Sequence, residues 1–358
     1  MADPRRVPKR VLRIAIAYFL FVIFSILNVY KWILSPIYRY FYAVRLPPVL
    51  RTPPECFAGV HALGYTFDAN YAHLPIGGGK TLPRVHYVDE GPRDGKVVLC
   101  LHGEPSWSFL YRKMIPIFVA NGYRVIAPDF IGFGKSDKYS SAGCYTHAMH
   151  TMTLRLLLDN LSLTNINLVC QDWGGLTGLS VAKDMPDRFA SITVMNTGMP
   201  IGQQFGDGYS FVKGLPFLLW QAAMRFFGRQ YPDTFLFSNL LKFPRSVAKG
   251  YLAPFPDWKY KAGGAVWPLL VPILADDTVA SDMVEVRQFI TDWSKPILVM
   301  FSDRDIVTRG LDRQFMSLAR NAQPAAVHKV IRGAGHFLQE THGVECAENI
   351  VSFLGDVL

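Results

Sequence analysis

Short apolar runs alternate with longer stretches of mixed polarity through most of the chain, and this pattern predicts strands that alternate with helices. Residues 97–101 form a continuous apolar run, which is typical of a strand buried on both faces of a parallel sheet. Further strands are expected at 84–89, 123–127, 167–170, 191–195, 296–301 and 326–331. Helices are expected at about 107–121, 147–161, 176–183, 312–321 and 343–354. The alternation predicts an α/β fold with a mostly parallel central sheet and helices on both faces.

The alternation stops after residue 197. From 198 to about 281 the chain is rich in aromatic residues, proline and glycine, and it contains no clear buried strand. We interpret 198–285 as an inserted helical cap. The core then consists of two parts, 57–197 before the cap and 286–358 after it.

The N-terminal segment has a different pattern. Between residues 14 and 34 only three polar residues interrupt an apolar run. As a helix with a rise of about 1.5 Å per residue, this run would span roughly 31 Å, which matches the hydrocarbon core of a bilayer. We therefore predict a transmembrane anchor within 1–40, followed by a proline-rich linker at 41–56. A helix on the membrane surface is the alternative, and a cleaved signal peptide is disfavoured because no clear small-residue cleavage site follows the run.

The distribution of charge agrees with this division of the chain. The net charge is +9, but residues 1–51 contain nine basic residues and one acidic residue, so the rest of the chain is nearly neutral. No nucleic-acid partner is therefore expected. Basic residues are more numerous before the apolar run than after it, which favours a cytosolic N-terminus and a lumenal main domain. The prediction is a single-pass membrane protein, with the endoplasmic reticulum as a candidate compartment.

Length and cysteine content narrow the class of protein further. The chain has 358 residues, of which 50% are hydrophobic, so it can bury one large core. Its five cysteines have no metal-ligand spacing, and their odd number argues against a framework of disulfides. No metal and no cofactor is expected, and the sequence indicates no particular protein partner.

The stretch 167–176 reads Asn-Leu-Val-Cys-Gln-Asp-Trp-Gly-Gly-Leu and is the first candidate for chemistry. A strand that leads through small residues directly into a helix has the shape of a nucleophile elbow, which holds a reactive side chain at the tip of a sharp turn. The residue at the tip is Asp172. A carboxylate in this position can displace a leaving group from saturated carbon and form an alkyl ester on the enzyme. For this stretch alone, an aspartate that merely caps a helix is the simpler alternative.

Two possible partners of Asp172 follow in the order acid, then histidine. Asp305 comes shortly after the predicted strand at 296–301, and His336 comes after the next strand, in a Gly-Ala-Gly-His sequence. Asp303 is a second candidate for the acid, but the usual spacing from the strand end favours Asp305. An ordered set of nucleophile, acid and histidine predicts a catalytic triad.

The segment Leu101-His-Gly-Glu-Pro-Ser-Trp107 follows the buried strand at 97–101. In this fold, the loop after that strand contributes a backbone amide to an oxyanion hole. We therefore expect the backbone N–H groups of Glu104 and Trp173 to converge on the carbonyl oxygen of Asp172.

From about residue 55 to 358 the chain resembles the haloalkane dehalogenases, specifically the subfamily with a His-Gly-Glu-Pro segment and two halide-binding tryptophans. The resemblance is carried by the segments 101–114, 127–138, 169–175, 253–257 and 333–340. It implies the α/β-hydrolase fold, with Asp172 as nucleophile, His336 as general base and Asp305 as the acid that orients the base. It also implies that Trp173 and Trp220 bind the halide, although ordinary packing in the cap is the alternative for Trp220.

The implied reaction is the hydrolysis of a small apolar haloalkane to an alcohol, a halide ion and a proton. An epoxide hydrolase is the nearest alternative, because it would use the same triad together with tyrosine hydroxyls from the cap. The candidate tyrosines are Tyr209, Tyr231, Tyr251 and Tyr260. The N-terminal segment resembles that of the eukaryotic membrane-bound epoxide hydrolases. An alternative of another class is a non-catalytic receptor or scaffold with a hydrolase fold, against which the intact triad argues.

Overall fold

The computed structural model describes residues 48–202, several residues between 219 and 238, 241–273 and 275–357. These residues belong to a compact unit that begins at Pro48. The predicted anchor at 1–40 and the first part of the predicted linker lie outside the described residues, and so does Trp220.

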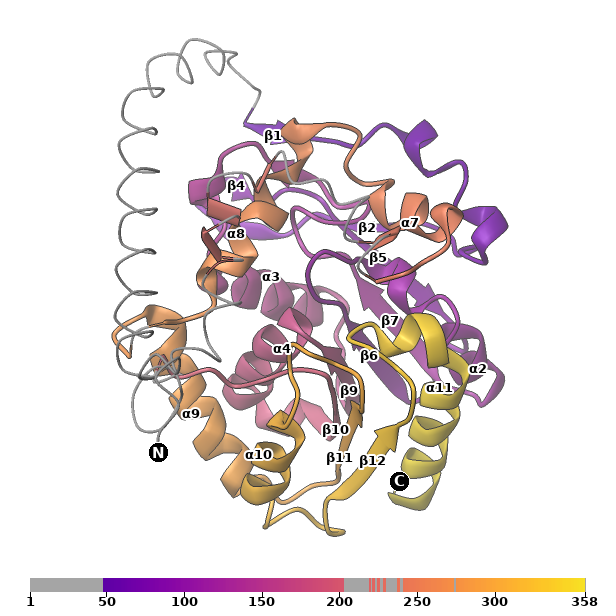
Figure 1. The fold of residues 1–358 in the computed structure, drawn as a ribbon, viewed down its shortest axis with the longest axis vertical. Coiled ribbons are helices and arrows are strands. Elements are labelled where there is room, and N and C mark those ends of the chain that lie inside the picture. The colour runs from indigo at the N-terminus through magenta and orange to yellow at the C-terminus, as the bar shows by residue number, and fades with distance from the viewer. Residues whose placement is uncertain are drawn as a thin grey trace, which may run out of the picture. The chain divides into compact units, whose positions relative to one another are not determined.

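The main sheet has eight strands in the order β12-β11-β10-β9-β6-β7-β5-β2 (Figure 1). The pairs from β7 through β12 are parallel, whereas β5 and β2 add antiparallel strands at one edge. The bounds of the strands are β2 Asn70–Ala72, β5 Val85–Glu90, β6 Val97–Leu101, β7 Arg124–Pro128, β9 Ile166–Gln171, β10 Phe189–Met195, β11 Ile297–Ser302 and β12 Val327–Ile331. The predicted mostly parallel sheet is therefore confirmed.

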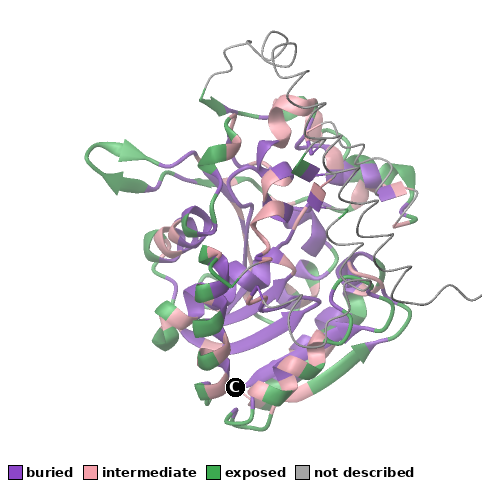
Figure 2. Ribbon diagram, turned by 60° about the vertical axis from the view of Figure 1, so that its left-hand side comes forward, coloured by how far each residue is buried: buried purple, intermediate pink, exposed green. Residues whose placement is uncertain are grey.

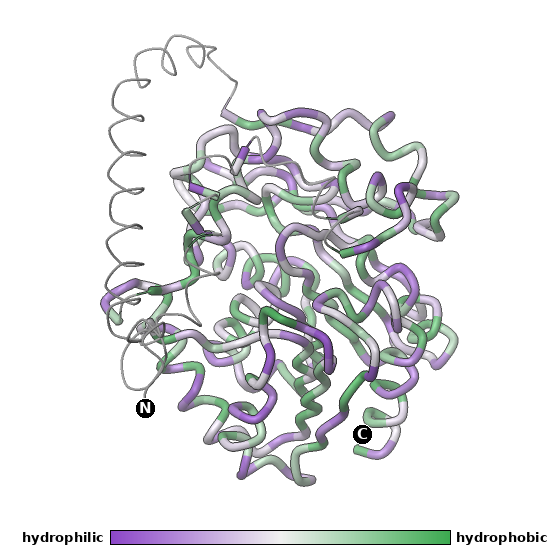
Figure 3. Tube along the Cα trace, in the orientation of Figure 1, coloured by the Kyte–Doolittle hydropathy of each residue, from purple (hydrophilic) through white to green (hydrophobic). Residues whose placement is uncertain are grey.

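Alternation of side chains along the strands divides the core into two layers, one on each face of the sheet. In β6, Val97, Leu99 and Leu101 join one hydrophobic cluster, while Val98 and Cys100 join the other. Every residue of β6 is buried, which explains why its sequence is a continuous apolar run (Figures 2 and 3).

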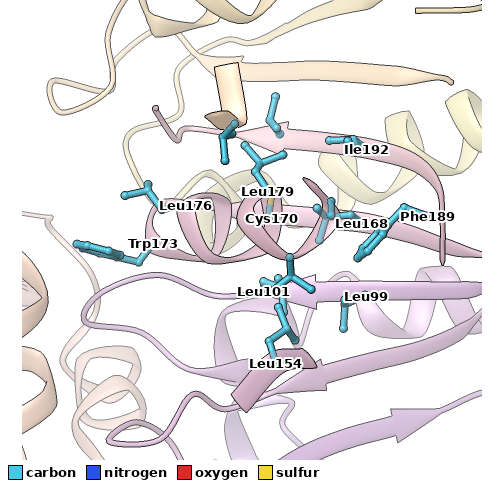
Figure 4. Packing of buried hydrophobic residues seen from close by; sticks show 14 of the residues in the cluster. Leu99, Leu101, Leu154, Leu168, Cys170, Trp173, Leu176, Leu179, Phe189 and Ile192 are labelled. Atoms are coloured by element: carbon cyan, nitrogen blue, oxygen red, sulfur yellow. The ribbon is translucent and has the colours of Figure 1, made fainter. Parts of the chain in front are cut away.

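Helices cover both layers. Helices α3, α4, α9 and α10 contribute to the first cluster, part of which Figure 4 shows, whereas α2 and α11 contribute to the second. The bounds of the helices are α2 Ile115–Ala120, α3 His147–Asn160, α4 Trp173–Asp184, α7 Arg245–Leu252, α8 Ala262–Leu270, α9 Thr278–Asp292, α10 Leu311–Leu318 and α11 Leu338–Val357.

The predicted helix at 107–121 is in fact two elements. A short 3-10 helix at Ser108–Tyr111 precedes α2, which begins at Ile115. Pro116 lies in the first turn of α2, the one part of a helix where the missing N–H of proline leaves no hydrogen bond unmade. The helical pattern of the sequence therefore continues from the 3-10 helix into α2, although the two are separate elements.

The small strands outside the main sheet have no counterpart in the predicted pattern. β1 (Val49–Leu50) pairs with β8 (Lys138–Tyr139), and β3 (Pro75–Gly77) pairs with β4 (Lys80–Thr81) in a hairpin. These strands have two or three residues each, which is too short for a hydrophobic period to be recognised.

Between β10 and β11 the described residues form helices α7, α8 and α9, a 3-10 helix at Trp258–Lys261, and no strand of the main sheet. Helix α9 runs without interruption across the predicted boundary between residues 285 and 286, and it packs against α4 and α10. The bounds proposed for the cap and for the two parts of the core stay a prediction.

The sequence predicts a membrane-spanning helix at 14–34, a segment outside the described residues. Among the helices that the structure describes, none is both long enough and apolar enough to cross a bilayer. Helix α11 has 20 residues, but it contains acidic side chains at Glu340, Glu345 and Glu348.

Candidate active site

The turn between β9 and α4 holds Asp172 in an unusual backbone conformation, with φ 51° and ψ −126°. A positive φ is unfavourable for a residue with a side chain, so the surrounding structure must hold it in place. The neighbourhood is too crowded for larger residues. A Cβ atom on Gly174 would lie 2.1 Å from the carbonyl oxygen of Leu101, and one on Gly103 would lie 2.3 Å from Asp172 Oδ1. Packing of the turn against the loop after β6 thus requires these glycines.

Hydrogen bonds from the end of β10 fix the backbone of this turn. The N–H of Asp172 donates to the carbonyl oxygen of Asn196 at 3.2 Å. The hydroxyl of Thr197 donates to the carbonyl oxygen of Asp172 at 2.7 Å. The N–H of Gly175 donates to the same oxygen at 2.9 Å and so begins the first turn of α4. These three bonds stabilise the strained conformation at the tip.

The carboxylate of Asp172 has a different neighbour at each oxygen. Oδ1 accepts a hydrogen bond of 2.8 Å from the backbone N–H of Glu104, and Oδ2 lies 3.5 Å from Nε2 of His336. The side chain is 20% exposed, so one side of it remains open to an incoming molecule. The Glu104 amide thus contacts the carboxylate directly, while the backbone amide of Trp173 follows Asp172 at the start of α4.

His336 is held by a buried carboxylate. Its Nδ1–H donates to Oδ2 of Asp305 at 2.9 Å. Asp305 is 1% exposed and also accepts hydrogen bonds from the backbone N–H of Val307 at 2.8 Å and from the hydroxyl of Thr308. Because Asp305 binds Nδ1, the other ring nitrogen of His336 is directed toward Asp172.

Asp303, the other candidate acid, has a different role. It is exposed, and its Oδ1 accepts a hydrogen bond of 2.7 Å from the backbone N–H of Gly333. It therefore supports the loop that leads to the histidine. The acid that contacts His336 is Asp305.

The charges in this group change one another's proton affinities. Burial disfavours ionisation of Asp305, but His336 and the hydrogen bonds from Thr308 and Val307 outweigh it, so the pKa of this carboxyl is lowered. Burial also disfavours the charged form of His336, but Asp305 and then Asp172 outweigh it and raise the pKa of the imidazole to about 10. Both carboxylates thus favour the protonated form of the imidazole.

The sequence analysis missed two polar residues that contact His336 and its loop. The side-chain amide of Asn196 donates to the carbonyl oxygens of Gly335 (3.1 Å) and His336 (3.0 Å). The amide nitrogen of Gln171 lies 3.1 Å from Nε2 of His336. Both residues lie at the carboxyl ends of strands, where a polar residue could have been suspected of reaching the neighbouring loops.

Aromatic side chains surround the start of α4. Trp173 is 3% exposed and stacks on Trp267 of α8, with ring centroids 5.5 Å apart and an interplanar angle of 21°. Figure 4 shows Trp173 at the border of the hydrophobic cluster. The second tryptophan that the sequence predicts at this site, Trp220, lies outside the described residues.

Comparisons with known proteins identify the family. Residues 96–238 match a family model described as alpha/beta hydrolase fold. The chain is 42% identical over 314 residues to a haloalkane dehalogenase of Psychrobacter cryohalolentis, and the alignment covers 86% of this chain and 98% of that one. The chain belongs to the haloalkane dehalogenase family. A haloalkane dehalogenase of Mycobacterium marinum is 38% identical over 307 residues, with 85% of this chain and 99% of the relative covered.

A solved structure of the family supports the same assignment. The haloalkane dehalogenase DpaA from Paraglaciecola agarilytica, which is described as tetrameric, superposes with a TM-score of 0.73 and 35% sequence identity. The superposition covers 84% of this chain and 97% of that chain. The predicted α/β-hydrolase fold and the resemblance to haloalkane dehalogenases are confirmed.

The family assignment also bears on localisation. The predicted location in the membrane of the endoplasmic reticulum rested on the apolar segment 14–34. It also rested on the resemblance of the N-terminal segment to that of eukaryotic membrane-bound epoxide hydrolases. The relatives that match are haloalkane dehalogenases of bacteria. The predicted localisation in the endoplasmic reticulum is therefore corrected.

Proposed function

We propose that this protein hydrolyses the carbon–halogen bond of small apolar haloalkanes and releases an alcohol, a halide ion and a proton. The observation that carries the proposal is the carboxylate of Asp172 at the tip of the strained turn. One of its oxygens is held by the Glu104 amide at 2.8 Å, and the other lies 3.5 Å from His336. The haloalkane dehalogenases among its relatives support this reaction.

The first step is a displacement at carbon. A carboxylate oxygen of Asp172 forms a bond to the halogen-bearing carbon while the carbon–halogen bond breaks, and the bonding electrons leave with the halide. Halide needs no proton to leave. Indole N–H groups of Trp173 and Trp220 bind the departing ion, and these bonds strengthen in the transition state because negative charge develops on the halogen.

The second step hydrolyses the ester on Asp172. His336 takes a proton from a water molecule, and the resulting hydroxide attacks the ester carbonyl carbon. The backbone amides of Glu104 and Trp173 stabilise the oxyanion, and the alcohol leaves as the carboxylate forms again. Asp305 orients His336 and stabilises the imidazolium.

The charges of the site favour this order of steps. Asp172 contributes, after Asp305, to the raised pKa of His336. Formation of the ester neutralises Asp172 and removes that contribution. The pKa of His336 must then fall, which favours the neutral imidazole when a general base is needed.

We also propose that residues 198–285, which include α7 and α8, form a cap that limits access of water to Asp172. An apolar, dry site would strengthen the interaction between the departing halide and its indole donors. The parts of the core before and after the cap would be 57–197 and 286–358.

The epoxide hydrolase alternative is not favoured. An epoxide oxygen must be protonated when the ring opens, which requires an available acidic hydroxyl. The hydroxyl of Tyr251 already donates to Glu340 at 2.8 Å within a buried ion pair with Arg112, and its pKa is raised well above the ordinary value, mainly by burial. Two other candidates, Tyr209 and Tyr231, lie outside the described residues. The assembled Asp172, His336 and Asp305 do not favour a non-catalytic scaffold.

Replacement of His336 by phenylalanine tests the proposed mechanism. Since His336 acts only in the second step, His336→Phe should release about one halide per enzyme from 1,2-dibromoethane and then stop, because loss of a general base costs ~10² to 10⁴ in rate. Intact mass should show one alkyl group, and peptide mapping should place it on Asp172. Asp172→Ala is the control and should acquire no adduct.

Three outcomes would contradict the proposal. Steady turnover by His336→Phe would remove His336 from the second step, and an adduct on another residue would remove Asp172 from the first. Absence of halide release from the wild-type protein with every haloalkane tried, alongside opening of epoxides, would favour the epoxide hydrolase.

A further inference from the structure

The indole of Trp267 is completely buried, and its Nε1 has no hydrogen-bond partner among the described residues. Other buried tryptophans differ in this respect. Nε1 of Trp107 donates to the carbonyl oxygen of Gly250 at 3.1 Å, and Nε1 of Trp293 donates to that of Pro296 at 3.3 Å. Buried donors are almost always satisfied, so an unpaired N–H indicates an acceptor that is not part of the protein.

Trp267 contacts the residue that follows the proposed nucleophile in the chain. Its ring stacks on that of Trp173, which directly follows Asp172 in the chain. It belongs to α8, in which Gly264 and Ala265 line a cleft together with Glu104. Trp267 thus contacts Trp173 and belongs to the helix, α8, that lies beside Glu104.

The surroundings of Trp267 suit a weakly hydrated anion. Phe133 stacks on it at 4.2 Å, and Phe130 meets it edge to face at 5.4 Å. His150, at 4.8 Å, is also fully buried, and burial lowers its pKa well below the ordinary value, so it contributes no charge. These neighbours carry no negative charge, so an anion beside Trp267 would meet the indole N–H without charge repulsion.

We propose that Trp267 donates its indole N–H to the halide ion that departs in the first step. This inference rests on the proposed function and adds a further halide-binding residue to Trp173 and Trp220. The chemical class of the ligand is a monovalent halide, with bromide and chloride as the probes. The competing occupant is an internal water molecule between Trp267 and His150, whose ring nitrogens also have no partner among the described residues.

Trp267→Phe keeps an aromatic ring on Trp173 but removes the donor. Its dissociation constants for bromide and chloride, measured by calorimetry on the full chain, should rise about tenfold to a hundredfold, which corresponds to one hydrogen bond to a charged group. The rate of the single-turnover halide burst should fall as well. Trp293→Phe is the matched control, because it removes an indole N–H that is bonded to Pro296, and it should leave halide affinity unchanged.

A measurement on the wild-type protein keeps the proposal testable if Trp267→Phe does not fold. The indole 1H–15N signal of Trp267 should shift as bromide is added, whereas that of Trp293 should not. An unchanged halide affinity in folded Trp267→Phe, or an unshifted Trp267 signal at saturating bromide, would assign the N–H to water and overturn the inference. A wild-type protein that binds no halide and releases none would instead refute the proposed function itself.

Discussion

Two clusters in this molecule combine a buried histidine with an aspartate and a possible nucleophile, but their geometries differ. In the cluster at the ends of the strands, the two ring nitrogens of His336 serve different partners. Nδ1 lies 2.9 Å from Asp305, and Nε2 lies 3.5 Å from Asp172. One nitrogen is therefore available to orient the ring and the other to exchange a proton.

The second cluster lies between helices α3, α4 and α9. Here the same nitrogen, Nε2 of His147, meets both partners, at 2.9 Å from Asp282 and 3.1 Å from Ser180. Nδ1 has no partner among the described residues. The hydroxyl oxygen of Ser180 also lies 2.8 Å from the carbonyl oxygen of Leu176, which competes with Asp282 for its one hydrogen. This arrangement cross-links three helices, but it leaves no ring nitrogen positioned to activate the serine.

The comparison shows that a catalytic triad requires the two ring nitrogens of the histidine to contact different partners, one the acid and the other the nucleophile. The presence of a histidine, an aspartate and a nucleophile does not by itself reveal this arrangement. The difference follows from location. Parallel strands bring their carboxyl ends to one edge of the sheet, where loops with Asp172, Asp305 and His336 can converge. In the second cluster, the side chains of His147, Ser180 and Asp282 instead contact one another between packed helices.

The largest expected difference between the two clusters concerns their aspartates. Asp305→Asn should slow ester hydrolysis by ~10² to 10⁴, because the amide cannot stabilise the imidazolium and favours the wrong orientation of the ring. Asp282→Asn should leave steady-state halide release within about twofold. Equal losses in the two variants, measured by stopped-flow halide release, would mean that the helix cluster also serves catalysis.

The pH dependence of stability should differ in direction between the clusters. The folded pKa of His336 is raised to about 10, so its contribution is complete below the unfolded value near 6.5 and is lost as pH rises toward 10. The pKa of Asp282 is lowered, because hydrogen bonds from His147, Lys183 and Ser180 outweigh burial. Its contribution is present above pH ~4 and is lost as pH falls further.

Thermal melts across the pH range check this prediction. His336→Phe should flatten the alkaline side of the stability profile, and Asp282→Asn should flatten the acidic side. Profiles that change on the same side in both variants would contradict the assignment of the shifts to these two groups.

The smallest expected effect is that of a substitution at Ser180 in the second cluster. Ser180→Ala removes the one hydroxyl that lies within hydrogen-bond distance of both Asp282 and Leu176, and it should lower the free energy of unfolding by about 1 to 2 kcal/mol. Halide release should not change. A loss of activity that persists at a temperature where the variant is fully folded would give Ser180 a role that its geometry does not suggest.

Much of the fold could be predicted, because burial of a strand on both faces leaves a local pattern. The bounds of β6 agree with the predicted run at 97–101, and the other strands of the parallel part agree within a few residues. The features that the sequence did not reveal depend on contacts between residues far apart in the sequence. Arg112 and Glu340 form a buried ion pair at 2.6 Å across 228 positions, and no local period indicates such a pair.

The site could be predicted in part for a similar reason. A sharp turn needs small residues near its tip, so Gly174 marks Asp172 in the sequence. Asn196 and Gln171 leave no comparable mark, because their contacts with the His336 loop depend on how β9 and β10 lie beside that loop. The contacts of Trp267 could not be predicted, since one more apolar residue in a helix is compatible with ordinary packing.

By itself, the sequence determined the order of strands and helices and the place of Asp172 at the turn after β9, because apolar runs and steric crowding act locally. The sequence favoured Asp305 over Asp303, but only the tertiary structure showed its contact with His336 and the stacking of Trp267 on Trp173. These contacts join distant segments. They follow from the pairing of β11 with β12 and from the close packing of α8 against the loop after β7, neither of which a local pattern encodes.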